Sequence, residues 1–122
     1  MTDTTRATYS ALRLFFPEDG LDLPFSVLNQ PGRVVLLTMM QNSLNHRALD
    51  DERSYRWVHG LRGRVVVDLA RMTTVNSALC GWLVGLMQSA KPSPVTLINA
   101  NARVGETLRL LRLDVLMTIE GK

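Results

Sequence analysis

The chain has very few of the side chains that bind metals or form disulfides. Its 122 residues include one cysteine, Cys80, and two histidines, His46 and His59. One cysteine excludes an internal disulfide and a metal site built from several thiolates, and it fits a reducing compartment. Neither an HExxH motif nor a Cys/His pair at metal-ligand spacing occurs. We predict no metal site, and a Cys80 that packs within a helix, because a nucleophilic role would need a nearby histidine.

Long apolar runs are also missing, although 46% of the residues are hydrophobic. No stretch approaches the ~20 apolar residues that cross a membrane. The N-terminal sequence MTDTTRATYS lacks the apolar core of a signal peptide. We therefore expect a soluble, cytoplasmic protein without a membrane span. A chain of this length fits one domain, which buries roughly two-thirds of its unfolded surface.

Motifs of common enzyme chemistries are absent. The glycines never fall into GxGxxG or GxxxxGK[ST], the loops that cradle phosphate groups. Ser77 lies in VNSAL, which lacks the GxSxG elbow of a nucleophilic serine. The adjacent acids Asp50, Asp51 and Glu52 favour a helix N-terminus, where negative charge is stabilised, over an acid–base pair. The sequence predicts no enzyme, no catalytic residue and no cofactor.

The net charge of +3 is carried almost wholly by arginine. Basic clusters with nearby aromatic residues can bind nucleic acid, and Tyr55 and Trp57 are available for stacking. However, acidic residues 50–52 adjoin the cluster and no nucleic-acid motif occurs, which favours a solvated face of mixed charge. We expect no direct contact with nucleic acid. The clustered arginines are Arg53, Arg56, Arg62, Arg64 and Arg71.

The first half of the chain predicts a domain that starts near residue 25. Residues 1–24 form an N-terminal extension that is either a first strand or partly flexible. The runs 25–29 and 33–40 flank a Pro-Gly pair, which is typical of a β-hairpin. A long helix is then expected from the acids at 50–52 to Gly60 or Gly63. Its buried face would carry Ser54, Trp57, Val58 and Leu61.

The second half alternates strands and helices. The β-branched run before Asp68 predicts a central strand at 65–69, covered on both faces. Helices are expected over 78–90, which the prolines of KPSP end, and over 103–112, with a buried strand at 95–98 between them. Val104, Leu108 and Leu111 would share one helix face, and Val115 would begin the closing strand. Residues 25–122 thus predict one α/β domain, a mixed four- or five-stranded sheet with helices mainly on one face.

Polar residues mark the turn between the central strand and the first apolar helix. Thr73, Thr74, Asn76 and Ser77 carry side chains that hydrogen-bond to nearby backbone in turns and helix N-caps. From Ala78 onward, apolar residues recur every three or four positions. Either Asn76 or Ser77 is therefore expected to cap the helix. Trp82 lies on the apolar side, which favours the core over an interface.

This strand, turn and helix resemble the STAS family, the domain of anti-sigma factor antagonists. The family motif reads roughly Asp-Ser-Ala-Gly-Leu-Gly-x-Leu after a strand that ends in Asp-Leu, and the resemblance covers about residues 25–119. PVTLINAN is similar to the next family strand, and VGETLRLLRLDVLMTI is similar to the last helix and final strand. The positions that agree with the motif are Ser77, Ala78, Gly81 and Leu83; those that differ are Asn76, Leu79 and Cys80.

The resemblance implies a regulatory binding module rather than an enzyme. STAS antagonists are phosphorylated on the serine after the acidic residue, which is Ser77 here. The implied partner is an anti-sigma factor or a serine kinase of the anti-sigma type. Its expected binding surface consists of Thr73, Thr74, Asn76, Ser77, Ala78 and Gly81.

Two alternatives remain open from the sequence. A STAS domain can also serve as an accessory or scaffold subunit of a transport or signalling complex, without a phosphoswitch. A nucleotide- or small-ligand-binding domain would use the helix start at Ser77, where free N–H groups favour an anion. The sequence does not specify the partner, the stimulus or the oligomeric state.

Overall fold

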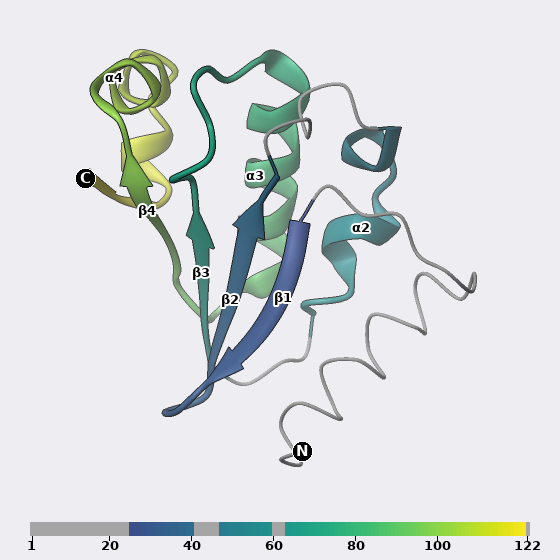
Figure 1. The fold of residues 1–122 in the computed structure, drawn as a ribbon. Coiled ribbons are helices and arrows are strands. Elements are labelled where there is room, and N and C mark those ends of the chain that lie inside the picture. Colours follow the sequence, from purple (N-terminus) through teal and green to yellow (C-terminus); the bar gives the residue numbers. More distant parts are fainter. Residues whose placement is uncertain (1–24, 41–46, 60–62, 122) are drawn as a thin grey trace.

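The computed structural model of the protein describes residues 25–40, 47–59 and 63–121. The predicted extension over residues 1–24 lies outside this part of the chain, as do Gly60 and Leu61 of the predicted first helix. The structure shows an α/β domain with a five-stranded mixed sheet (Figure 1). The expected fold class is therefore confirmed.

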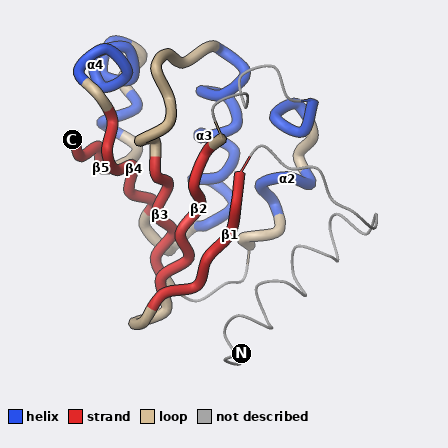
Figure 2. The backbone as a smooth tube through the Cα atoms, viewed as in Figure 1, coloured by secondary structure: helices blue, strands red, loops and turns tan. Residues whose placement is uncertain are grey.

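The five strands lie in the sheet in the same order as in the chain (Figure 2). β1 and β2 pair antiparallel, which confirms the hairpin, and β2, β3, β4 and β5 run parallel to one another. β3 is the central strand, as the apolar run predicts. The strands are β1 (Phe25–Gln30), β2 (Val34–Met39), β3 (Arg64–Asp68), β4 (Val95–Ala100) and β5 (Thr118–Gly121).

One face of the sheet forms the core. In register across β2, β3 and β4, Leu37 pairs with Val67 and Val67 with Leu97, and all three side chains are fully buried. Because successive residues of a strand point to opposite faces, Val66 faces away from this row. Val66 is 9% exposed, more than any other residue of the buried set, and lies outside the continuous core.

Two longer helices bury their apolar sides against the core. α3 (Ser77–Ala90) agrees with the expected helix to within one residue, and α4 (Ala102–Leu110) follows β4. Trp82 of α3 and Leu108 of α4 are buried in the same continuous core. Figure 1 shows α3 running along one face of the sheet. The expected position of α3 is confirmed, and α4 begins within one residue of its expected start.

The predicted long first helix is wrong. The chain instead forms a short 3-10 helix, η2 (Arg47–Asp50), and one turn of α-helix, α2 (Arg53–Arg56). The Asp51 carboxylate accepts the Arg53 backbone N–H at 3.0 Å, and the Ser54 hydroxyl lies 2.6 Å from the Ala48 carbonyl oxygen. These side-chain contacts lie at the start of α2 and separate it from η2, because they engage backbone groups that a helix running across residues 48–53 would use.

The C-terminal part also departs from expectation. α4 ends at Leu110, and Arg112 adopts a left-handed backbone with φ of 61° that reverses the chain. Leu111 is consequently 54% exposed instead of sharing the buried face of α4. Val115 belongs to a 3-10 helix, η3 (Leu113–Val115), rather than to the last strand, and is 75% exposed.

Candidate functional site

The candidate site is the connection from β3 to α3, which contains the predicted polar turn (Figure 1). Asp68, the last residue of β3, anchors its start. One Asp68 carboxylate oxygen accepts the Ala70 backbone N–H at 2.9 Å and the Asn99 side-chain amide at 3.1 Å. Asn99 lies on the adjacent strand β4 with φ of 60°, a conformation that asparagine tolerates better than most residues. The loop is therefore fixed to two neighbouring strands.

Asn101 holds the middle of the same loop. Its side-chain amide donates to the Met72 carbonyl oxygen at 3.1 Å, and its amide oxygen accepts the Val104 backbone N–H at 2.8 Å. One side chain thus caps α4 and fixes the loop ahead of Ser77. Neither Asn99 nor Asn101 was predicted from the sequence to take part in the site. The sequence feature that could have indicated them is the pair of asparagines at the end of the strand, in the sequence INAN. The carboxyl ends of adjacent parallel strands meet at one edge of a sheet, so these side chains lie beside the end of β3.

Asn76, and not Ser77, caps α3. Its side-chain oxygen accepts the Leu79 backbone N–H at 2.9 Å, and its backbone is extended, as an N-cap requires. Ser77 is the first helical residue and is exposed. Its hydroxyl makes no hydrogen bond to the described part of the chain. The Ser77 side chain therefore does not cap the helix.

Every residue of the predicted partner-binding set is at least partly exposed. Leu79 is fully buried and Cys80 nearly so, which directs the adjacent Ala78 and Gly81 outward. A Cβ added at Gly81 would meet no atom within 4 Å. The exposed members of the predicted set are Thr73, Ser77 and Gly81, and the half-buried members are Thr74, Asn76 and Ala78.

Cys80 and Trp82 point away from this surface. Cys80 is buried, as predicted, and burial raises the pKa of its thiol. The indole N–H of Trp82 donates to the Ser54 hydroxyl at 2.9 Å, within the core. Trp82 is therefore a core residue and not an exposed anchor for a partner.

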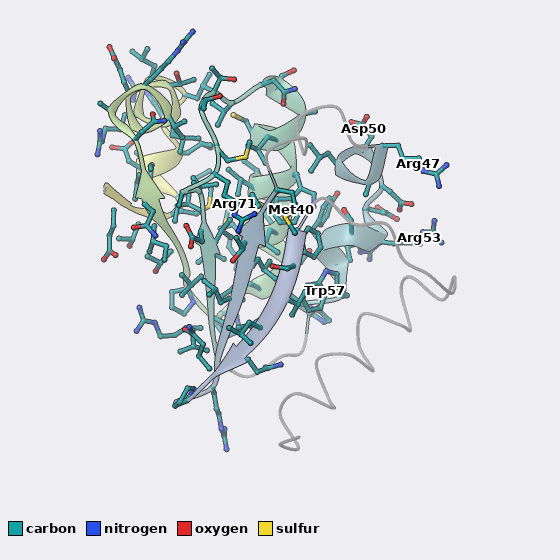
Figure 3. All side chains as sticks on the ribbon, in the orientation of Figure 1. Met40, Arg47, Asp50, Arg53, Trp57 and Arg71 are labelled. Carbon is teal, nitrogen blue, oxygen red and sulfur yellow. The ribbon has the colours of Figure 1, made fainter. Side chains whose placement is uncertain are left out.

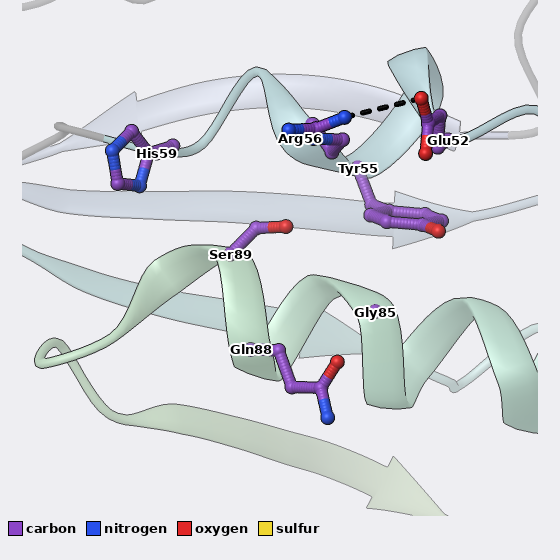
Figure 4. A pocket seen from close by; sticks show the side chains of 7 residues that line it. All are labelled: Glu52, Tyr55, Arg56, His59, Gly85, Gln88 and Ser89. Carbon is purple, nitrogen blue, oxygen red and sulfur yellow. Dashed lines mark hydrogen bonds and ion pairs between the residues drawn. The ribbon is translucent and has the colours of Figure 1, made fainter.

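A groove of about 400 Å³ lies elsewhere on α3, between its C-terminal half and α2 (Figure 4). Its wall includes the Glu52–Arg56 ion pair at 3.1 Å and the ring of Tyr55. Gln88, also in the wall, follows Ser77 by 11 residues, which corresponds to about 16 Å along a helix. The groove is thus separate from the predicted ligand position at the start of α3.

Among the residues that the structure describes, the predicted arginine cluster does not form one basic patch. Arg53 pairs with Asp51 at 2.7 Å, and Arg56 pairs with Glu52. The Arg53 hydrogen bond lowers the pKa of Asp51, and both side chains are partly exposed. Arg64 and Arg71 lie at opposite ends of β3. Figure 3 labels Arg53 on α2 and Arg71 in the loop after β3, and the mixed-charge arrangement agrees with the sequence prediction.

Two other kinds of site are absent from residues 25–40, 47–59 and 63–121. These residues contain no group of three or more acidic, histidine or cysteine side chains that could hold a metal ion. None of the helices in the same part of the structure is long and apolar enough to cross a bilayer.

No protein-family model and no curated protein sequence matches the chain. Several solved structures, however, match the chain in fold. A candidate anti-sigma factor antagonist from Thermotoga maritima aligns with a TM-score of 0.60 at 18% identity, covering 80% of this chain and 86% of that chain. An NMR structure of the same protein gives 0.64 at 19% identity over 86% and 85%. An anti-sigma-factor antagonist (STAS) domain protein from Planctomyces limnophilus gives 0.67 at 13% identity over 80% and 90%.

These likenesses show that the chain has the fold of anti-sigma factor antagonist (STAS) domain structures. The resemblance inferred from the residues around Ser77 is confirmed at this level. Because a fold hosts several functions, partner and mechanism must be argued from the site.

Proposed function

We propose that this protein is an anti-sigma factor antagonist-like binding module whose docking surface is the turn 73–76 together with the start of α3. Its partner is an anti-sigma factor or a serine kinase of the anti-sigma type, and binding is switched by phosphorylation of Ser77. The module is non-catalytic and acts in the cytoplasm. The observation that carries the proposal is that Asn76, and not Ser77, caps the helix. The exposed Ser77 hydroxyl is therefore available to a kinase.

A phosphate on Ser77 is compatible with the fold. It would lie at the N-terminus of α3, where the free N–H groups and the helix dipole favour negative charge. For a partner docked over the same turn, the phosphate adds bulk, about two negative charges and a desolvation cost. Phosphorylation would therefore release the partner without unfolding the domain.

The departures from the family motif are consistent with this role. Asn76 retains a capping oxygen where the family has an acid, and Leu79 fills the core where the family has a glycine. Both changes leave Ser77 and Gly81 exposed. The docking surface is thus kept although the motif is altered.

The test measures folding and binding separately on Ser77 variants. Ser77→Ala should bind a kinase-type anti-sigma factor from the same genome and resist release by it. Ser77→Asp should keep the wild-type melting temperature but bind about 1 to 3 kcal/mol more weakly in calorimetry, the scale of a poorly paired interfacial charge. Gln88→Glu, which adds charge to an exposed position further along α3, is the matched control and should bind normally. Equal affinity of Ser77→Asp and wild type would refute the switch.

A second candidate function is a STAS scaffold or accessory subunit without a phosphoswitch. The observation that favours it is Asn76, because a kinase that reads the family's acidic residue would not find it here. Mass spectrometry of the protein from its own cells distinguishes the two. Phosphate on Ser77 supports the switch, and its absence together with transporter or signalling subunits in a pull-down supports the scaffold.

A further inference from the structure

The segment that follows α4 carries an apolar patch that the fold does not use. Four large aliphatic residues within seven positions are about half exposed or more, namely Leu110 at 76%, Leu111 at 54%, Val115 at 75% and Leu116 at 49%. We call these four residues the C-terminal patch. Several exposed large apolar side chains in one short segment mark interaction surfaces more often than single exposed ones do.

Arg112, between the two halves of the C-terminal patch, has a left-handed backbone conformation. Arg112 has φ of 61° at the point where α4 reverses, a position that glycine normally fills. The reversal is held by the Leu111 N–H bound to the Thr107 carbonyl at 3.1 Å and by the Arg112 N–H bound to the Arg109 carbonyl at 2.9 Å. An arginine in the left-handed region costs stability that glycine would not. Arg112 therefore keeps a side chain at a position where glycine would be more stable.

The charges beside the patch are of both signs. Arg112 and Asp114 are exposed and two residues apart, and neither forms an ion pair with any residue that the structure describes. In a two-fold symmetric contact, the same patch on both copies meets itself, so that residue i faces j and j faces i. Arg112 and Asp114, which lie between the two halves of the patch in the sequence, satisfy this requirement, because each arginine can face the other copy's aspartate.

We propose that the C-terminal patch is the contact surface of a two-fold homodimer, in which Arg112 of each copy pairs with Asp114 of the other. Leu110, Leu111, Val115 and Leu116 form its apolar centre. Strand pairing between the two β5 edges is not needed, since β5 is short and carries the exposed Glu120, features that protect an edge. The contact rests on side chains and not on sheet extension.

The geometry keeps this surface apart from the proposed docking surface. The patch follows the C-terminal end of α4, whereas Asn101, which contacts the loop ahead of Ser77, lies at its N-terminal end. The dimer should therefore leave Ser77 accessible. Loss of dimerisation and loss of partner binding are thus separable outcomes.

The dimer is expected to be weak and concentration-dependent, because small interfaces below about 1,200 Å² are typically transient. Sedimentation velocity on the full chain over roughly 10 μM to 1 mM, a range chosen for such affinities, should show a shift from the monomer toward twice its mass. Leu110→Ser combined with Val115→Ser should abolish this shift. Leu28→Ser, which alters an exposed leucine on β1, is the matched control and should leave the shift unchanged.

Reversing the charges of Arg112 and Asp114 then distinguishes a homodimer contact from binding of another partner to the patch. Arg112→Glu and Asp114→Arg should each weaken dimerisation about tenfold, since each places like charges face to face. The double variant should restore it, because the pair is re-formed with reversed signs. Arg112→Gly should melt at a higher temperature and yet dimerise less, which rules out unfolding as the cause. A monomeric wild type at ~1 mM, or no rescue in the double variant, would overturn the proposal.

Discussion

The indole N–H of Trp82 on α3 donates a 2.9 Å hydrogen bond to the hydroxyl of Ser54 on α2, a residue 28 positions earlier. Ser54 is fully buried, and its hydroxyl lies 2.6 Å from the Ala48 carbonyl oxygen and 2.7 Å from the Asp51 carbonyl oxygen. The Ser54 carbonyl in turn accepts the indole N–H of Trp57 at 2.6 Å. One small residue therefore joins α2 and α3 and satisfies polar groups that the core would otherwise leave unpaired.

Ser54→Ala should lower the free energy of unfolding by about 1 to 3 kcal/mol, because it leaves the Trp82 indole N–H buried without a partner. Trp82→Phe removes that donor, so the double variant should lose less than the sum of the single changes. Urea unfolding of the four proteins in this cycle provides the measurement. Strictly additive losses would show that the bond contributes nothing.

Leu108 and Leu111 give a matched pair, since one is fully buried and the other 54% exposed. Leu108→Ala should destabilise the domain by about 2 to 5 kcal/mol through lost burial and a cavity. Leu111→Ala should cost less than about 1 kcal/mol, as surface changes do. Denaturation midpoints of the two variants are compared at protein concentrations too low for the proposed dimer to form. Equal midpoints would contradict the exposed placement of Leu111.

Gly81 and Gly85 lie on the same helix and should respond oppositely to alanine. An added Cβ meets open space at Gly81 but lies 2.6 Å from the Tyr55 ring at Gly85. Gly81→Ala should stabilise the domain by roughly 0.5 to 1 kcal/mol through helix propensity. Gly85→Ala should be less stable than Gly81→Ala by at least ~1 kcal/mol because Tyr55 must move. Thermal melts with the two variants side by side decide this.

Asn76→Ala should reduce stability by about 0.5 to 2 kcal/mol, because the Leu79 N–H loses its capping acceptor. Asn76→Asp restores the acid of the STAS motif and keeps the cap, with a favourable helix-dipole interaction. It should therefore melt at or above the wild-type temperature. A destabilised Asn76→Asp protein would contradict the capping geometry.

Cys80 should resist alkylation. Burial raises the pKa of its thiol, so iodoacetamide at pH 8 should modify the native protein far more slowly than the unfolded chain. Because the unfolded thiol loses its proton at lower pH than the native one, stability should fall as the pH rises above about 8.5, and Cys80→Ala should lack this component. In Ser77→Cys, the added exposed thiol serves as the control and should react rapidly.

The sequence by itself determined the elements whose signals are local. The apolar run 65–67 predicted the central strand, the Pro-Gly pair predicted the hairpin, and the spacing after Ala78 predicted α3 to within one residue. These predictions succeed because hydrophobic periodicity and turn chemistry act over a few residues. The resemblance around Ser77 also lies within one such local segment.

Long-range contacts decided what the sequence could not. Asn99 and Asn101 came to hold the loop because β3 and β4 end at the same edge of the sheet. The expected long first helix was replaced by α2, whose Ser54 bonds to Trp82 far along the chain. Each outcome depends on which distant groups meet, and no short-range pattern encodes that choice.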